Sequence, residues 1–272
     1  LYDRYAHYIP YVPRRYTRFR IAKHTSYYYG RVDRVIVPSE AAGRWLRRHA
    51  VATPMTVIPT GIANGPILDR SEERRALGIA PGHKVLLYVG RLAREKNLEL
   101  IFEAAEIVMR DDPSIRLFLV GDGPHSPALG ALARRLKIGD RVRFVGFVPR
   151  GEVDRYYAAA DLFVFGSLTE TQGLVVLEAF NYGLPAIVAS GGGASEWVRD
   201  GANGYSVPPD PAAFASAMRG TLGSDEVCAQ LSEGALRTAR SQGPEQMAAR
   251  VVEVYRQAMR ESEIARERVG IG

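Results

Sequence analysis

Two hydrophobic patterns alternate along the chain beyond residue 80. Short runs of consecutive apolar residues, rich in β-branched side chains, predict strands that are covered on both faces. Between these runs, apolar residues recur at i, i+3 and i+4 spacing, which predicts helices around Leu98–Met109 and Leu129–Leu136. The strands are expected at Val85–Val89, Ile115–Val120, Val142–Val145, Leu162–Phe165 and Ala186–Ala189. This alternation predicts an open α/β domain with a parallel sheet.

The first 65 residues follow a less regular pattern. Arg34–Pro38 and Met55–Ile58 predict short strands, and Ser39 predicts the cap of a helix over Glu40–His49. Two strands are too few to close a sheet, so residues 1–65 are interpreted as the last elements of another α/β unit.

Two further segments are expected outside the regular part. Asn64–Arg74 is interpreted as a linker, and Gln246–Arg268 predicts a terminal helix. The apolar residues of this helix form one stripe, namely Met247, Val251, Val254, Tyr255 and Met259.

Length and composition narrow the class of protein. The 272 residues suit one large domain or two modest ones. The single cysteine, Cys228, excludes a disulfide framework and a cysteine-based zinc site, and it makes a reducing, cytoplasmic setting the default. No run of 18 uncharged apolar residues predicts a membrane-spanning helix. The chain begins at Leu1 without a secretory pattern, and a segment upstream of it is expected.

The positive charge is concentrated at one end of the chain. Residues 1–50 hold 11 Lys and Arg against three Asp and Glu, whereas the remaining residues hold 25 against 27. Such a patch suggests an anionic partner, which would be a membrane surface, a nucleic acid or an acidic substrate. Nucleic acid is the least favoured, because the nearby aromatic residues show no recognised binding motif.

Basic residues follow the first regular strand. In Gly90–Asn97, the glycine allows a sharp turn, and Arg91 and Lys96 are expected to project into one crevice, where two fixed cations suit a diphosphate. A solvated basic loop is the alternative. After the next strand, Gly121–Pro124 predicts a tight turn that brings backbone close to a ligand, although such turns are commonly structural.

Two carboxylates lie eight positions apart in Ser167–Ala179. A helix is expected to begin near Gln172 or Gly173, so Glu170 precedes it and Glu178 lies within it. At the helical rise per residue the two carboxylates are about 10–12 Å apart, which suits two ends of one ligand. Free amides at the helix start, those of Gln172, Gly173 and Leu174, suit phosphate oxygens. Glu178 as a merely exposed residue is disfavoured, because its neighbours predict a mostly buried helix.

Other segments carry weaker signals. Phe144–Pro149 is interpreted either as a flat slot for a nucleobase or as a buried strand and its exit. The glycines of 190–196 give backbone freedom near a ligand, and Glu196 is expected to cap the next helix or to lie early in it. The chain has no Asp-x-Asp and no P-loop motif, and its histidines lack metal-ligand spacing. His125 is expected either at the surface or lining the cleft.

The ordered set of segments resembles the family 4 glycosyltransferases, which are retaining enzymes of the GT-B fold, over residues 32–260. The matching segments are Val37–Ser39, Ile58–Ile62, Gly90–Asn97, Gly121–Pro124, Val145–Val148, Glu170 with Glu178, and the Gly191–Gly204 region. The resemblance implies a complete Rossmann-like, donor-binding C-terminal domain at 66–245. It also implies a remnant of the acceptor-binding domain at 1–65, and a terminal helix at 246–272 that crosses back to that domain.

The resemblance also implies roles for individual residues. Arg91 and Lys96 would bind the diphosphate of a nucleotide sugar, Glu178 the ribose hydroxyls, and Glu170 the transferred sugar. The first two and Glu170 would be catalytic. The whole implied donor site is Gly90, Arg91, Lys96, Gly121, Phe147, Val148, Glu170, Thr171, Gln172, Gly173, Leu174 and Glu178, with the backbone near Phe147 and Val148 meeting the base. The family's sites generally need no metal or other cofactor.

The opening Leu1–Pro10 is similar to a narrower branch that glycosylates diacylglycerol or related lipids. This implies a hexose, with UDP-glucose the suggested donor. The basic and aromatic residues 1–50 are expected to bind peripherally to the inner face of the cell membrane; the alternative is that this segment packs within the full N-terminal domain and its charges are solvated. A catalytic His-Thr pair usually precedes this segment, and His7 is not at the matching position. The alternatives are a non-catalytic nucleotide-sugar binding module, an inactive fragment that lacks the acceptor domain, or a sugar-nucleotide epimerase. Nothing in the sequence indicates an oligomeric state.

Overall fold

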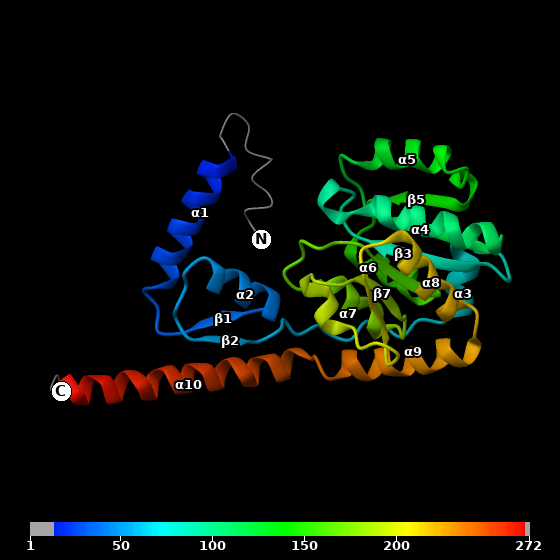
Figure 1. Cartoon of the computed structure of the whole chain (residues 1–272). Coiled ribbons are helices and arrows are strands. Elements are labelled where there is room, and N and C mark those ends of the chain that lie inside the picture. Colours follow the sequence, from blue (N-terminus) through cyan, green and yellow to red (C-terminus); the bar gives the residue numbers. More distant parts are fainter. Residues whose placement is uncertain (1–13, 270–272) are drawn as a thin grey trace. The chain divides into compact units, whose positions relative to one another are not determined.

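The computed structural model describes residues 14–269 (Figure 1). They form two compact units, one from Ile62 to Ser241 and one from the residues up to Gly61 together with those from Gln242 onward. The predicted features at Leu1–Pro10, His7 among them, lie outside the described residues.

A six-stranded parallel sheet forms the centre of the larger unit. Its spatial order is β5-β4-β3-β6-β7-β8, so the sheet grows in one direction from β3 to β5 and in the other from β6 to β8. The strands are β3 (Lys84–Val89), β4 (Ile115–Val120), β5 (Val142–Gly146), β6 (Leu162–Phe165), β7 (Ala186–Ala189) and β8 (Gly204–Val207). The predicted α/β class with a parallel sheet is confirmed, and the strand order reverses between β3 and β6.

Helices cover both faces of this sheet. Those of the larger unit are α3 (Arg70–Ala76), α4 (Leu98–Asp111), α5 (Ser126–Arg135), α6 (Arg150–Ala159), α7 (Leu174–Asn181), α8 (Pro211–Leu222) and α9 (Asp225–Arg240). Short 3-10 turns are η2 (Arg94–Lys96), η3 (Gly139–Arg141) and η4 (Gly193–Trp197). Helix α4 packs against α8, and α7 packs against α9. The central strands are therefore buried, as their uninterrupted apolar runs require.

The prediction that Val142–Val145 is covered on both faces is wrong. Strand β5 lies at the edge of the sheet and pairs with β4 alone. Phe144 is 38% exposed, and the Arg143 guanidinium lies 5.2 Å from the centre of the Phe118 ring. An edge strand has only one neighbour, so its side chains are less covered than those of β3 or β6.

The interpretation of Asn64–Arg74 as a linker holds only for its first half. Asp69 caps helix α3 by accepting a hydrogen bond from the Glu72 backbone N–H at 2.8 Å. Arg70 and Arg74 then form ion pairs with Asp161, at 2.6 and 3.0 Å. This helix has no buried residue, and ion pairs instead of an apolar stripe connect it to the unit.

The smaller unit is built on two parallel strands, β1 (Val35–Val37) and β2 (Met55–Val57). The cap predicted at Ser39 is confirmed, because its hydroxyl accepts from the Ala42 N–H at 3.1 Å at the start of α2 (Glu40–Arg48). Helix α1 (Arg14–Tyr29) precedes these strands. The buried apolar cluster consists of Val35, Val37, Ala42, Leu46 and Val51.

The predicted terminal helix is α10 (Pro244–Val269), which belongs to the smaller unit. Arg250 donates to the Val57 carbonyl oxygen at 2.6 Å, and Arg34 forms an ion pair with Glu261. Within the predicted apolar stripe Val254 is buried, whereas Tyr255 is 64% exposed.

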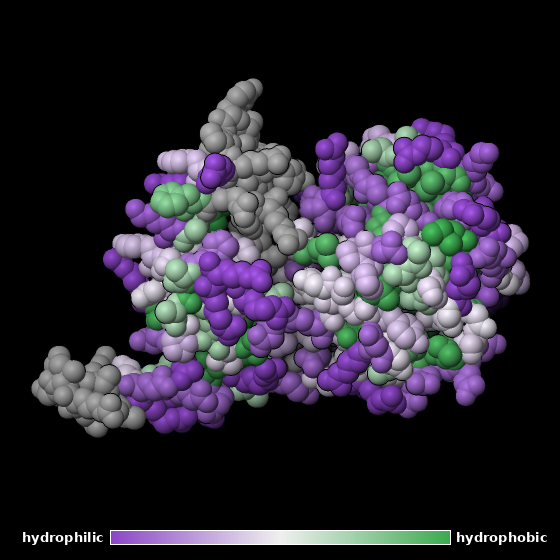
Figure 2. All heavy atoms as spheres, in the orientation of Figure 1, coloured by the Kyte–Doolittle hydropathy of each residue, from purple (hydrophilic) through white to green (hydrophobic). Residues whose placement is uncertain are grey.

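No helix within the described residues is long and apolar enough to cross a membrane. On the face shown in Figure 2, hydrophilic residues predominate among the coloured atoms and the hydrophobic residues form separate patches.

Candidate functional site

The predicted site residues gather at the carboxyl edge of the sheet, where the strand order reverses. Ligands of open α/β sheets bind at this place, because the loops on either side of the reversal diverge. A cavity of 250 Å³ opens there between the ends of β3 and β6. Its lining is Tyr88, Val89, Gly90, Lys96, Phe165, Glu170, Thr171, Gln172, Gly173, Leu174 and Val175.

The backbones of the loops after β3 and β4 lie in close contact. Gly121 has φ of +128°, and a Cβ atom there would lie 2.1 Å from the Gly90 carbonyl oxygen. The Gly121 N–H also donates to the Gly146 carbonyl oxygen at 2.8 Å. The structure thus gives Gly121 a packing role between loops, and its contact with a ligand stays a prediction.

Lys96 and Glu170 meet directly inside the cavity as an ion pair. Their side chains are only 16% and 23% exposed. The groups expected for the diphosphate and for the sugar therefore neutralise each other, and an anionic ligand would compete with Glu170 for the ammonium group.

Arg91 was expected to share one crevice with Lys96, but only Lys96 is among the residues that line this cavity, and the Arg91 side chain is 53% exposed. The Arg91 guanidinium contacts the nearly buried Glu95 carboxylate at 3.2 Å. The Tyr88 hydroxyl donates to the backbone carbonyl oxygen of Arg91 at 3.0 Å. Burial, followed by the charge of Glu170, raises the pKa of the Tyr88 phenol. This tyrosine therefore remains a neutral donor beside the cavity.

The loop that carries Glu170 is fixed to its neighbours on two sides. Towards β3, the hydroxyls of Ser167 and Thr169 each donate to the Glu95 carbonyl oxygen at 3.3 Å. On the other side, the Trp197 indole N–H donates to the Gln172 carbonyl oxygen at 2.7 Å. The loop is held in place by these contacts without any ligand.

The predicted glycine turn at 190–196 makes room for this loop. A Cβ atom on Gly193 would lie 2.1 Å from the Thr171 carbonyl oxygen, and the Gly193 N–H donates to the Glu170 carbonyl oxygen at 3.1 Å. Glu196 lies exposed in η4, as expected for a residue early in the next helical segment.

Helix α7 begins at Leu174, directly after Gly173 in the left-handed region at φ +70°. The first amides of a helix have no partner within it and form its positive end, so those of Leu174 and Val175 face the cavity side of the loop as candidate anion donors. The Gln172 side chain is only 5% exposed, and its Nε2 has no hydrogen-bond partner within the described residues.

Glu178 lies one turn further along α7 and is 29% exposed. The Tyr157 hydroxyl donates to its Oε2 at 3.0 Å, and the Arg150 guanidinium lies 3.6 Å from its Oε1. The expectation that this carboxylate needs partners is therefore confirmed. The partners themselves were missed, because they stand on α6 and no sequence spacing connects the two helices.

The remaining candidates lie apart from the cavity lining in the described part of the chain. Phe147 is 80% exposed beside Gly146, and the nucleobase slot stays a prediction. His125 is buried, 8% exposed, with its Nε2 2.6 Å from Glu99, so it neither lies at the surface nor lines this cavity. The described residues include no group of three or more His, Cys, Asp or Glu that could hold a metal ion.

The chain was compared with known protein families and with proteins of known function. Residues 69–238 match the family Glycosyl transferases group 1. The α-monoglucosyldiacylglycerol synthase of Streptococcus pneumoniae is 38% identical over 163 residues, which are 57% of this chain and 37% of that protein. The D-inositol 3-phosphate glycosyltransferase of Geodermatophilus obscurus is 36% identical over 250 residues, which are 87% and 55% of the two chains.

The chain is also similar in fold to solved glycosyltransferase structures. Anabaena Alr3699/HepE in complex with UDP matches with a TM-score of 0.76 and 25% identity, over 83% of this chain and 64% of that one. The match covers only 37% of the length of the Streptococcus pneumoniae relative and 55% of the length of the Geodermatophilus obscurus relative. The GT-B fold expected from the resemblance is confirmed by these neighbours. Because the family match covers more than half of its residues, the chain belongs to the group 1 glycosyltransferases.

Proposed function

We propose that this chain carries the donor site of a retaining hexosyltransferase that uses a nucleotide diphosphate sugar, with UDP-glucose as the donor. The observation that carries the proposal is the convergence of Lys96 and the amino end of α7 on one cavity at the reversal of the sheet. The structure of Anabaena Alr3699/HepE in complex with UDP supports a uridine nucleotide.

In this proposal, the positive groups act on the diphosphate. Lys96, Arg91 and the first amides of α7 stabilise the negative charge that develops as the diphosphate leaves the sugar. Departure and attack on the same face of the sugar would retain the anomeric configuration. Since these groups supply the positive charge, we propose that the site works without a metal ion.

Two carboxylates bind the rest of the donor. Glu170, inside the cavity, accepts hydrogen bonds from hydroxyls of the transferred hexose. Glu178, on the side of the site that leads to the loop after β5, accepts from the ribose hydroxyls. The backbone near Phe147 and Val148 meets the base.

Calorimetry of the chain with UDP, UDP-glucose and GDP-mannose tests the donor site. We expect UDP and UDP-glucose to bind, and Glu178→Ala to weaken both. Absence of binding by every nucleotide would overturn the donor site. Transfer of labelled glucose to diacylglycerol in vesicles separates a transferase from a module that only binds the nucleotide sugar.

The acceptor is proposed to be a membrane lipid, reached by peripheral binding to the inner face of the cell membrane. The name of the Streptococcus pneumoniae relative supports a diacylglycerol-based lipid. Helix α1 supports a membrane surface, because its exposed residues Tyr16, Phe19, Arg20, Lys23 and Tyr27 recur at helical spacing and so share one face.

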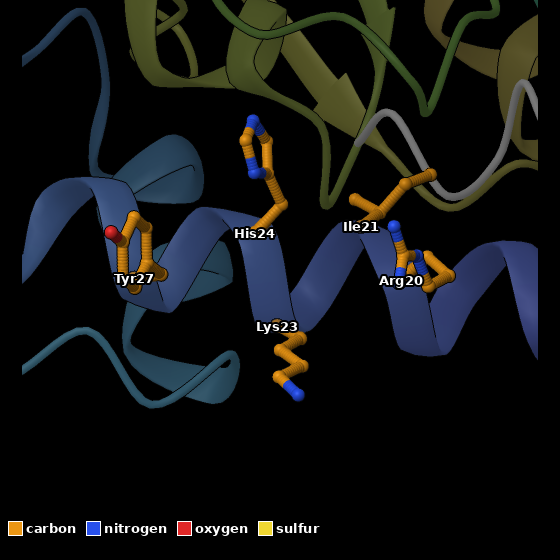
Figure 3. A pocket seen from close by; sticks show the side chains of 5 residues that line it. All are labelled: Arg20, Ile21, Lys23, His24 and Tyr27. Carbon is orange, nitrogen blue, oxygen red and sulfur yellow. The ribbon is translucent and has the colours of Figure 1, made fainter.

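This face combines the two residue types that suit an anionic bilayer. Arginine and lysine near such a surface contribute about 1 kcal/mol each, and aromatic rings favour the interface. Figure 3 shows Arg20, Lys23 and Tyr27 along α1, with Lys23 pointing away from the side that carries His24. All three line a hollow beside the helix together with Ile21.

Sedimentation with vesicles tests the membrane surface. We expect the chain to bind vesicles that contain phosphatidylglycerol, and to bind pure phosphatidylcholine vesicles weakly. Arg20→Glu with Lys23→Glu should abolish binding, whereas the matched pair Arg134→Glu with Arg135→Glu on α5 should not. Equal loss in both variants would reduce the effect to net charge.

A further inference from the structure

We propose that Tyr157 is a positioning residue for Glu178 and thereby sets the preference of the site for ribose over 2′-deoxyribose. The proposal rests on the function proposed above, in which Glu178 accepts the ribose hydroxyls. It adds a residue on another helix that acts through Glu178 and does not itself touch the nucleotide.

Tyr157 holds the Glu178 carboxylate from the buried side. Its side chain is 1% exposed, and its hydroxyl donates to Oε2 at 3.0 Å. Its ring stacks on Tyr182, with the centres 6.1 Å apart and the planes 8° from parallel, and lies 6.0 Å from the ring of Phe163. A ring packed in this way cannot turn, so the donor remains aimed at the carboxylate.

Arg150 contacts the same carboxylate but cannot orient it equally well. Its side chain is 95% exposed and its closest approach to Oε1 is 3.6 Å. An exposed ion pair of this kind contributes little and leaves the long side chain free to move. The orientation of Glu178 is therefore determined mainly by Tyr157.

The hydrogen bond from Tyr157 occupies one acceptor position of the Glu178 carboxylate and leaves the others for a ligand. A carboxylate has about four acceptor positions on its two oxygens. Tyr157 fills one on Oε2 and so fixes the plane of the group. The remaining positions on Oε1 and Oε2 can accept from the two neighbouring hydroxyls of a ribose. A 2′-deoxyribose lacks one of these donors and leaves one acceptor unpaired, which carries a penalty.

The tyrosine keeps its proton while it does this. Burial, followed by the charge of Glu178, raises the pKa of the Tyr157 phenol well above its ordinary value. The hydroxyl is therefore a permanent donor to the carboxylate.

The experiment measures the ratio of dissociation constants for 2′-deoxy-UDP and UDP by calorimetry. Tyr157→Phe removes one hydroxyl and keeps the packed ring. We expect it to weaken UDP binding by roughly 5-fold, the value of one hydrogen bond, and to leave 2′-deoxy-UDP binding nearly unchanged. The ratio should therefore fall towards one. A purely structural role would weaken both ligands alike.

Two further variants make the result specific. Tyr156→Phe, the same change at the neighbouring position, should leave the ratio at its wild-type value. In a Glu178→Ala background, Tyr157→Phe should have no further effect on UDP binding, because Tyr157 acts through Glu178.

The outcomes separate this proposal from the proposed function. If Glu178→Ala lowers the ratio and Tyr157→Phe does not, the positioning role is overturned and the donor site stands. If Glu178→Ala itself leaves the ratio unchanged, Glu178 does not bind ribose, and both the role of Glu178 and that of Tyr157 fall.

Discussion

The two units of the chain use the same kind of parallel strand to different effect. In the larger unit, six strands lie between helices on both faces, and the central strands are fully buried. Among the described residues of the smaller unit, the cluster buried by two strands has five members. Because the fraction of surface that is buried rises with the size of a domain, we expect the larger unit to be the more stable one and to hold a fixed site.

The two units also differ in how their positively charged side chains are arranged. In the larger unit, cations near the site are held against carboxylates, as in the Lys96–Glu170 pair. In helix α1, Arg20 and Lys23 are exposed beside aromatic rings. The first arrangement suits one small anion in a defined place, whereas the second suits an extended anionic surface.

The largest expected effect is on the core of the larger unit. Phe163 is fully buried between Phe165 and Tyr157, so Phe163→Ala should lower the free energy of unfolding by about 3–5 kcal/mol. Val37→Ala in the smaller unit should cost about 1.5 kcal/mol, the value of two methyl groups. Urea unfolding followed by circular dichroism measures both. Because Phe163→Ala deletes many more buried atoms than Val37→Ala, equal losses would mean that the smaller core contributes more stability per buried atom and would contradict this ranking.

The next effect concerns the cavity. Lys96→Ala should weaken UDP binding by about 10- to 100-fold, because a charge-assisted contact with the diphosphate is lost. Arg135→Ala, on the exposed surface of α5, is the control and should leave the dissociation constant unchanged. A Lys96→Ala chain that binds UDP like the wild type would remove Lys96 from the site.

A smaller effect on UDP affinity, of opposite sign, is expected at Glu170, the ion-pair partner of Lys96. Glu170→Gln removes the negative charge that holds Lys96, so UDP should bind about 3-fold more tightly, in line with the modest value of a partly exposed pair. UDP-glucose should gain less, since the sugar loses its carboxylate contact. Weaker binding of UDP in calorimetry would show that the pair pre-organises Lys96 instead of competing for it.

The smallest effects on stability come from two helix caps, one in each unit. Ser39→Ala and Asp210→Ala each remove a side chain that accepts from a backbone N–H, at 3.1 and 2.8 Å, and each should cost about 1 kcal/mol. Hydrogen exchange should speed up in α2 for the first variant and in the first turn of α8 for the second. Faster exchange in β3 caused by Ser39→Ala would show that the two units unfold together.

The sequence predicted those parts of the fold in which burial is complete. β3, β4, β6 and β7 are uninterrupted apolar runs because both faces are covered, and their bounds were found to within one residue. Edge strand β8 was missed, since Tyr205 and Ser206 are only partly buried and break the apolar pattern. Helix α3 was missed for a related reason, because ion pairs fix it and leave no periodic apolar signal.

Some residues of the candidate site could be predicted from the sequence, whereas others depend on how the helices pack. The resemblance assigned Lys96 and Glu170 to one donor site, and the structure places both in one cavity at the carboxyl edge of the sheet. Tyr157 was not predicted, since its contact with Glu178 depends on how α6 and α7 pack. The sequence indicates that a buried carboxylate needs a partner, but only tertiary structure selects the partner.

The hydrogen bond from Trp197 to the Gln172 carbonyl oxygen has a spectroscopic consequence. The chain has two tryptophans, and each unit contains one of them. Trp45 stacks on His49 with the ring centres 4.0 Å apart, whereas Trp197 is bonded to a residue that lines the donor cavity. With Trp45 replaced by phenylalanine, the remaining indole emission comes from Trp197 alone, which is hydrogen-bonded to the loop that lines the cavity, so occupancy of the cavity can be followed by intrinsic fluorescence without a label.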